Sequence, residues 1–241
     1  MDQALLRGKT VMIFDMDGTL IDSVGLWNAV DERLIERIRE DGKDTLENIQ
    51  EQRDAALRRF SCEENPYLAY CAWLKETYRS SLSAQEIHTL RYALVQDDLQ
   101  NRIDYKPGAD ECIRRLKAQG YTLVIATTTR RSNMDIYRTR NVHIREKANI
   151  DDYFDRVYTR EDAREIKPHP EIYQTVLREL NVQAEECLVF EDSLIGLEAA
   201  KRAGIPSVAV YDRYSSADWP RLREWADAHI LSYAELMEAI G

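Results

Sequence analysis

The chain has 241 residues, enough for one large domain or two small ones, and its apolar fraction of 44% can form a sizeable core. A net charge of −10 argues against non-specific binding to nucleic acid or to an anionic membrane. No apolar stretch approaches the roughly 20 residues that span a bilayer, no secretory segment is visible, and four scattered cysteines suit a reduced cytoplasmic protein.

The first predicted element is a buried strand over Val11–Phe14, which leads directly into two carboxylates, Asp15 and Asp17. Side chains at positions i and i+2 of an extended segment point the same way, so the two acids share one face. Such a pair can hold a hard cation, or it can divide into a nucleophile and a proton donor. Gly18 follows at once and permits a tight turn and close approach of a ligand to the backbone.

A calcium loop and a plain turn are the alternatives for this motif. Asp-x-Asp-Gly also begins calcium-binding loops, but the twelfth position, counted from Asp15, is Leu26 rather than the Glu that such a loop requires. Asp-Gly is also a common turn, although a turn needs no buried strand before it. The motif therefore favours a catalytic site.

The next roughly 80 residues show helical periodicity only. Helix caps and apolar stripes predict a small helical bundle over residues 22–103. Its four helices are expected after Asp22–Ser23, over Leu46–Phe60, from Pro66, and after the capping box Ser83–Glu86.

From Tyr105 onward, helices and strands alternate. Helices are expected over residues 107–116, 134–139, 170–180 and 194–203, and strands over residues 121–126, 156–158, 187–190 and 207–210. This alternation indicates βαβ units and a parallel sheet, which the first strand joins. The sequence thus predicts an α/β fold: a Rossmann-like parallel sheet core of residues 1–21 and 104–241, with the helical domain, residues 22–103, inserted above the strand ends.

Chemically useful side chains follow the strands of this sheet. In open parallel sheets, ligands bind at the carboxyl ends of the strands. The residues expected to meet at that edge are Asp15, Asp17, Thr127, Thr128, Lys167, Glu191 and Asp192.

Each of these residues has an ordinary structural explanation when it is taken alone. Thr127 can be a strand-end hydroxyl or a helix cap, and Lys167 can be a solvated loop lysine. Glu191 and Asp192 can simply cap the following helix and complement its dipole. Their convergence on one edge of one sheet favours a common site.

These motifs, in this order, resemble those of the haloacid dehalogenase-like superfamily. The first motif is Asp15–Leu20, the second is Thr127, the third is Lys167, and the fourth runs from Glu191 to Gly204. The resemblance covers most of the core. The position of the helical insert, directly after the first motif, is similar to the cap of the subfamily that contains β-phosphoglucomutase and phosphoglycolate phosphatase.

The resemblance implies phosphoryl transfer to Asp15. Two unit charges at ~4 Å repel by roughly 1 kcal/mol in water and about 4 kcal/mol at an effective dielectric of 20, so positive charge must be supplied. The resemblance also implies a Mg²⁺ ion that is held by Asp15, Asp192 and the backbone carbonyl of Asp17, and to which Glu191 binds directly or through water. Lys167 is expected to add a third positive charge.

The resemblance gives the remaining motif residues separate roles. Thr127, with Thr128 beside it, is expected to bind the transferring phosphate oxygens. Asp17 is expected to donate a proton to the leaving alcohol and then take one from the attacking water. An aspartate at this position points to phosphate esters, because dehalogenases lack it and phosphonoacetaldehyde hydrolases carry a small residue there.

The predicted function is a Mg²⁺-dependent phosphatase of a small phosphorylated metabolite, a sugar phosphate or a similar ester, acting through an aspartyl phosphate. No nucleic acid or membrane partner is expected, and the protein is expected to be a monomer or a weak homodimer. A phosphomutase on the same scaffold is the alternative enzyme, and a non-catalytic phosphate-ligand binding protein is the third hypothesis.

Substrate choice is expected to depend on the cap and on its rim. After the second motif, Arg130 and Arg131 either contact substrate or form the solvated start of a helix. Residues 141–149 form a longer link than the family usually has and are expected to alter a rim or a partner contact. The candidate cap residues are Trp27, Arg53, Arg58, Arg59 and Lys75.

Overall fold

The computed structural model describes residues 3–42 and 48–241. Within these residues, six strands form one sheet in the order β3-β2-β1-β4-β5-β6, and every neighbouring pair is parallel. The predicted α/β fold with a Rossmann-like parallel sheet is confirmed. The strands are β1 (Val11–Phe14), β2 (Thr122–Ala126), β3 (Arg156–Tyr158), β4 (Cys187–Glu191), β5 (Ser207–Val210) and β6 (Ala228–Ile230).

The central strand β1 is buried along its whole length, as expected for a parallel strand covered on both faces. Its last residue, Phe14, lies opposite Ile125 of β2 and Phe190 of β4. Because the three strands are parallel and in register, the residues that follow them emerge at the same edge. This pairing brings together the motifs that the sequence scatters over more than 170 positions, from Asp15 to Asp192.

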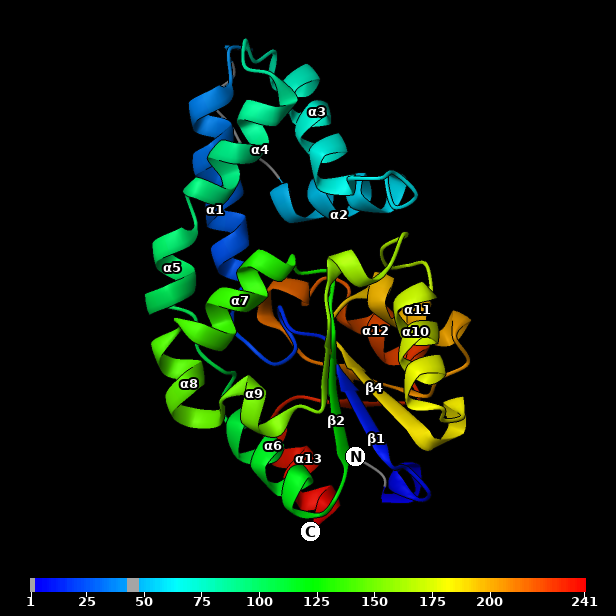
Figure 1. The fold of residues 1–241 in the computed structure, drawn as a ribbon. Helices are drawn as coiled ribbons and strands as arrows, with labels where there is room; N and C mark the ends of the chain where they lie inside the picture. The colour runs from blue at the N-terminus through cyan, green and yellow to red at the C-terminus, as the bar shows by residue number, and fades with distance from the viewer. Residues whose placement is uncertain (1–2, 43–47) are drawn as a thin grey trace.

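Helices cover both faces of the sheet (Figure 1). Successive side chains of β1 point to opposite faces of the sheet, so Met12 and Ile13 belong to separate apolar clusters. The helices of the Met12 face are α6 (Ala109–Ala118), α7 (Arg131–Thr139), α8 (Val142–Ala148), α9 (Ile150–Tyr153) and α13 (Tyr233–Ile240). Those of the opposite face are α10 (Glu171–Leu180), α11 (Leu194–Arg202) and α12 (Trp219–Trp225), and short 3-10 helices lie at Gln3–Leu6, Arg160–Asp162, Ala184–Glu186 and Arg213–Ser215.

A second group of helices lies beyond the carboxyl ends of the strands, at the top of Figure 1. These are α1 (Val24–Ile38), α2 (Ile49–Arg59), α3 (Pro66–Tyr78) and α4 (Ala84–Ala93). They enclose an apolar cluster of their own, and we call this group the cap. The predicted capping box of Ser83 and Glu86 is confirmed. Leu46, expected in the second helix, lies outside the described residues.

The segment after Ser83, which was expected to form one helix, forms two helices, and the second of them leads the chain back to the core. The fourth cap helix ends at Ala93, and α5 (Gln96–Asn101) follows as a separate helix, with Leu99 packed into the core cluster of the Met12 face. The domain limits at residues 22 and 103 stay a prediction.

Smaller differences from the predicted elements have local causes. The helix expected at residue 107 begins at Ala109, and Pro170, expected in the first turn of a helix, is the residue before α10. Strand β6 and helices α5, α12 and α13 were not predicted, since short segments carry too little periodicity. The long link at residues 141–149 forms α8, and the Asn141 side chain donates to the carbonyls of Leu99 (2.7 Å) and Ile103 (2.9 Å).

A buried ion triad holds the cap helices together, and the sequence did not indicate it. Asp31 of α1 is fully buried and accepts hydrogen bonds from Arg91 Nε of α4 (2.6 Å) and Arg53 Nη1 of α2 (3.0 Å). Burial alone would raise the pKa of Asp31, but the two guanidinium groups outweigh it and hold the pKa below its usual value.

We expect Asp31→Asn to lower the free energy of unfolding by about 3–5 kcal/mol near neutral pH, because it leaves two buried guanidinium groups without their anion. Since the folded-state pKa of Asp31 is depressed, the wild-type advantage should be present above the unfolded pKa and disappear as the pH falls through the folded one. Urea unfolding measures both effects.

The control is Arg33→Ala, which removes the half-exposed pair with Asp98 and should cost less than about 1 kcal/mol. Equal losses in Asp31→Asn and Arg33→Ala would contradict a structural role for the triad.

Candidate active site

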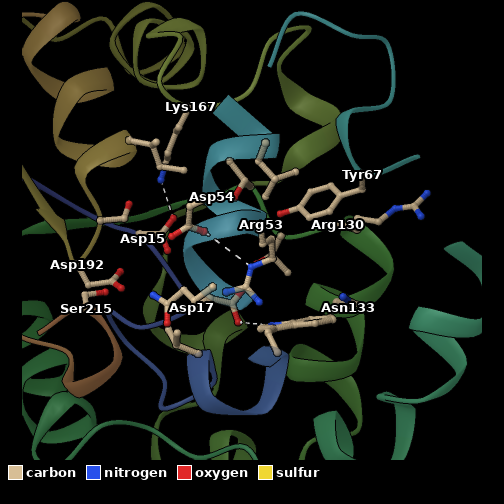
Figure 2. A pocket seen from close by; sticks show the side chains of 18 of the residues that line it. Asp15, Asp17, Arg53, Asp54, Tyr67, Arg130, Asn133, Lys167, Asp192 and Ser215 are labelled. Atoms are coloured by element: carbon tan, nitrogen blue, oxygen red, sulfur yellow. Dashed lines mark hydrogen bonds and ion pairs between the residues drawn. The ribbon is translucent and has the colours of Figure 1, made fainter. Parts of the chain in front are cut away.

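Lys167 lies at the centre of the predicted site. Its ammonium group is 2.6 Å from both Asp15 Oδ1 and Glu191 Oε1 and donates to the Ala126 carbonyl oxygen at 2.8 Å. The side chain is 2% exposed, so it is not the solvated loop lysine of the ordinary explanation. Figure 2 shows Lys167 reaching towards Asp15. Three motifs thus meet through direct contacts.

Three buried carboxylates form a cluster at this edge of the sheet, and two of them, Asp15 and Glu191, contact the ammonium group. Oxygens of Asp15, Glu191 and Asp192 lie within 4.8 Å of one another. Burial raises the pKa of Asp15 to about 7, with Lys167 acting in the opposite direction, and burial together with Glu191 raises the pKa of Asp192. Three ionised carboxylates and one ammonium group leave two negative charges, which a divalent cation would balance. An all-oxygen donor set suits Mg²⁺.

Asp192 is fixed by the turn that follows β1. Thr19 Oγ1 donates to its Oδ1 at 2.9 Å, and Gly18 packs against its Oδ2. A Cβ at Gly18 would lie 2.2 Å from that oxygen, and the φ of Gly18 is +80°. Both the space and the backbone conformation therefore require glycine.

We expect Gly18→Ala to lower the free energy of unfolding by more than about 1 kcal/mol and to displace Asp192 from the cluster, with loss of activity. The matched control is Gly120→Ala: Gly120 has a φ of +87°, but nothing lies within 4 Å of its Cβ position. Thermal unfolding and activity of the two variants separate backbone strain from the clash. Loss of activity in both, or in neither, would contradict the role assigned to Gly18.

Glu191 is the last residue of β4, which is one residue longer than the predicted strand over residues 187–190. Besides Lys167, it accepts hydrogen bonds from Tyr173 Oη at 2.8 Å and Ser193 Oγ at 3.1 Å. Its side chain is therefore held inside the site, while Ser193 caps α11 by accepting from the Gly196 amide. Tyr173, on α10, was missed because an apolar helix face gives no signal for a buried hydroxyl.

The Asp17 carboxylate lies outside the cluster of three acids. It accepts hydrogen bonds from Ser23 Oγ (2.5 Å), Trp27 Nε1 (3.1 Å) and Thr129 Oγ1. The first two donors lie at the start of the cap and the third follows β2, so the carboxylate lies where the cap meets the core. Three donors therefore hold the Asp17 side chain, and its role in proton transfer stays a prediction.

The three threonines after β2 make different contacts. The Thr127 hydroxyl donates to Thr129 Oγ1 at 3.1 Å and accepts from the Thr129 amide at 3.2 Å, as a strand-end hydroxyl would. Thr128 and Thr129 line the cavity together with Asp15, whereas Thr127 is not among the residues that line it. The phosphate-binding role of Thr127 and Thr128 stays a prediction.

A cavity of about 140 Å³ lies between the strand ends and the cap (Figure 2). Since one water needs roughly 10–15 Å³ on this measure, it can hold a small metabolite. Lining residues from the core include Asp15, Asp17, Thr128, Lys167 and Asp192, and those from the cap include Trp27, Arg53, Tyr67, Arg91 and Tyr92.

The candidate cap residues fall into two groups, those that line the cavity and those that do not. Trp27 and Arg53 line the cavity, but Arg58 forms an ion pair with Glu198 on the core. Neither Arg59 nor Lys75 is among the residues that line it. Tyr67, Arg91 and Tyr92 were missed because the bundle's apolar and charged positions do not show which side faces the core.

The two arginines after the second motif have different positions. Arg130 lines the cavity, 3.2 Å from His88 Nε2 and over the ring of Tyr92. Arg131 is exposed and donates to Asp162 at 2.7 Å, as expected for the start of a helix.

Comparisons with known proteins agree with this geometry. Residues 9–204 match the family of haloacid dehalogenase-like hydrolases, to which the chain therefore belongs. It is 30% identical over 198 residues to a phosphorylated carbohydrates phosphatase of Thermotoga maritima, covering 82% of each chain. It is 29% identical over 218 residues to the protein CbbY of Rhodobacter capsulatus, covering 86% of this chain and 90% of that one.

Among solved structures, the chain resembles a mutant CbbY of Rhodobacter sphaeroides in complex with xylulose-(1,5)bisphosphate. The TM-score is 0.73 at 25% identity, over 96% of this chain and 99% of that one. The predictions of the family and of an enzyme are confirmed. In the part of the chain that the structure describes, no helix has the length and apolar character needed to cross a membrane.

Proposed function

We propose that the protein is a Mg²⁺-dependent phosphatase of small phosphorylated carbohydrates or similar phosphomonoesters, acting through an aspartyl phosphate at Asp15. The observation that carries the proposal is the bridge of Lys167 between Asp15 and Glu191, at 2.6 Å from each. It supplies positive charge beside the one carboxylate that stands directly after the central strand.

In this proposal the Asp15 oxygen attacks phosphorus and the alcohol leaves. Lys167 offsets the repulsion between the carboxylate and the phosphate, and the hydroxyl groups and amides above Asp15 orient the phosphate oxygens. Mg²⁺, held by Asp15, Asp192, Glu191 and the Asp17 carbonyl, would supply two further positive charges.

Asp17 would move the protons. Its hydrogen bonds to Ser23 and Trp27, where the cap meets the core, support this role, because the alcohol would leave and water would attack on that side. It would give a proton to the alcohol and take one from the water that hydrolyses the aspartyl phosphate.

Two observations support a phosphorylated carbohydrate as the substrate class. The relatives include a phosphatase named for such compounds and a protein in complex with a sugar bisphosphate. The cavity is small, roofed by the cap and lined by polar side chains, which suits a hydroxylated ligand.

A panel of sugar phosphates and simple phosphate esters, assayed for phosphate release with Mg²⁺, tests the proposal. Hydrolysis of at least one ester is expected, and no release from any of them would contradict it. Product analysis with a hexose 1-phosphate addresses the alternative: free phosphate indicates a phosphatase, and an isomeric sugar phosphate indicates a mutase.

We also expect chelation by EDTA to abolish hydrolysis and added Mg²⁺ to restore it, because without a divalent cation the buried acidic cluster opposes the approach of a phosphate. Isothermal titration of Mg²⁺ into the chelated protein should show one site that Asp192→Asn weakens. Full activity in EDTA would exclude the metal requirement.

A further inference from the structure

Ile166, the residue before Lys167, lies in the apolar cluster of the cap. It belongs to the core part of the chain, yet its side chain is 2% exposed and is a member of the apolar cluster that α1 to α4 form. Among the described residues, it is the only member of that cluster from outside the cap segment. A loop of the core therefore inserts one apolar side chain into the cap.

Polar contacts tie the same loop to the turn between α2 and α3. The Ile166 amide donates to the Ser61 carbonyl at 3.3 Å, and Arg160 donates to the Glu64 carbonyl at 3.0 Å. Cys62 Sγ donates to Glu165 Oε2 at 2.9 Å. The loop is thus held by the cap at several points before it reaches Lys167.

One residue further on, the loop enters the charged site. Lys167 makes its three contacts with Asp15, Glu191 and the Ala126 carbonyl there. Neighbouring Cα atoms are about 3.8 Å apart, so the position of Ile166 constrains that of Lys167. Movement of the cap away from the core would expose Ile166 to water or pull the loop with it. In the second case Lys167 would be drawn away from its three contacts.

We propose that Ile166 is a positioning residue that couples the placement of the Lys167 ammonium group to the position of the cap. The charge that phosphoryl transfer needs is then completed only when the cap covers the cavity. Under the proposed function, on which this inference rests, a substrate that does not draw the cap onto the core would be hydrolysed slowly.

The test compares Ile166→Ala with Ile38→Ala. Both side chains are 2% exposed members of the same cap cluster, but Ile38 is the last residue of α1, at the end of that helix farther from the sheet (Figure 1). Both variants should lower the melting temperature. Only Ile166→Ala should lower kcat, at least about tenfold, because the geometry of Lys167 is lost while the cavity stays.

A milder pair covers the case in which the alanine variants do not fold. Ile166→Val should lower kcat about two- to threefold and Ile38→Val should leave it unchanged. Equal kcat values for the Ile166 and Ile38 variants, in either pair, would overturn the proposal.

Binding of inorganic phosphate, measured by calorimetry on the same proteins, gives a readout besides turnover. Ile166→Ala should weaken binding about tenfold relative to Ile38→Ala, since Lys167 contributes to anion binding. If the wild type hydrolyses no ester, the proposed function fails while this comparison still decides the role of Ile166. Equal phosphate affinities would show that Ile166 only fills the apolar cluster.

Discussion

Asp15→Asn is expected to lower kcat by more than about 10⁴-fold, because the amide cannot form the aspartyl phosphate on which the proposed reaction depends. The variant should fold normally. Burial raises the pKa of Asp15, so the ionised carboxyl is costly in its place, and the neutral amide has nearly the same shape. Phosphate release at saturating substrate measures the effect.

The melting temperature is the control for this variant, and it should not fall. An Asp15→Asn protein that keeps more than about one tenth of the wild-type kcat would contradict covalent catalysis by this residue. A protein that loses both activity and its cooperative unfolding would show that Asp15 is needed for folding, and the test would then use Asp15→Ala and Asp15→Ser.

Lys167→Met is expected to have the second-largest effect. It should lower kcat by about 10²–10³-fold, since the positive charge beside the attacked phosphate is lost. It should also lower the free energy of unfolding of the metal-free protein by about 3–5 kcal/mol, because Asp15 and Glu191 are left as neighbouring buried acids without a cation. Urea unfolding and steady-state kinetics measure the two effects.

The matched control is Lys117→Met, which removes a surface lysine paired with Asp155. It should cost less than about 1 kcal/mol and leave kcat unchanged. If Lys167→Met behaves like Lys117→Met in both measurements, the bridge between Asp15 and Glu191 does not have the role proposed here.

The acidic residues at the carboxyl ends of the strands could be predicted to lie together, because the sequence signals for them are local. Val11–Phe14 is an apolar strand with two acids directly after it, and Glu191 and Asp192 follow a second apolar strand. Parallel pairing then brings such strand ends together without further information. Lys167 has no such local signal, and its place at this edge was expected only from its convergence with the other residues and from the resemblance to a known family.

The roof of the site could not be predicted in this way. Asp31 and Arg91 are 60 positions apart, and nothing in the helical periodicity shows that they form a buried ion pair. The hydrogen bond between Trp27 and Asp17 could not be predicted either. In the sequence Trp27 is one of the apolar residues of a helix, and only the structure shows that its indole N–H lies 3.1 Å from the Asp17 carboxylate. Contacts between the faces of different helices depend on packing, which a single sequence does not specify.

The most direct test of the central claim is to detect phosphate on Asp15. Enzyme quenched with acid during turnover is digested, and the peptide that contains Val11–Leu20 is analysed by mass spectrometry, with and without borohydride reduction. The proposal predicts one phosphoryl group on Asp15, converted by borohydride to homoserine at that position. Steady hydrolysis with an unmodified Asp15 at every quench time, together with activity retained in Asp15→Asn, would contradict it.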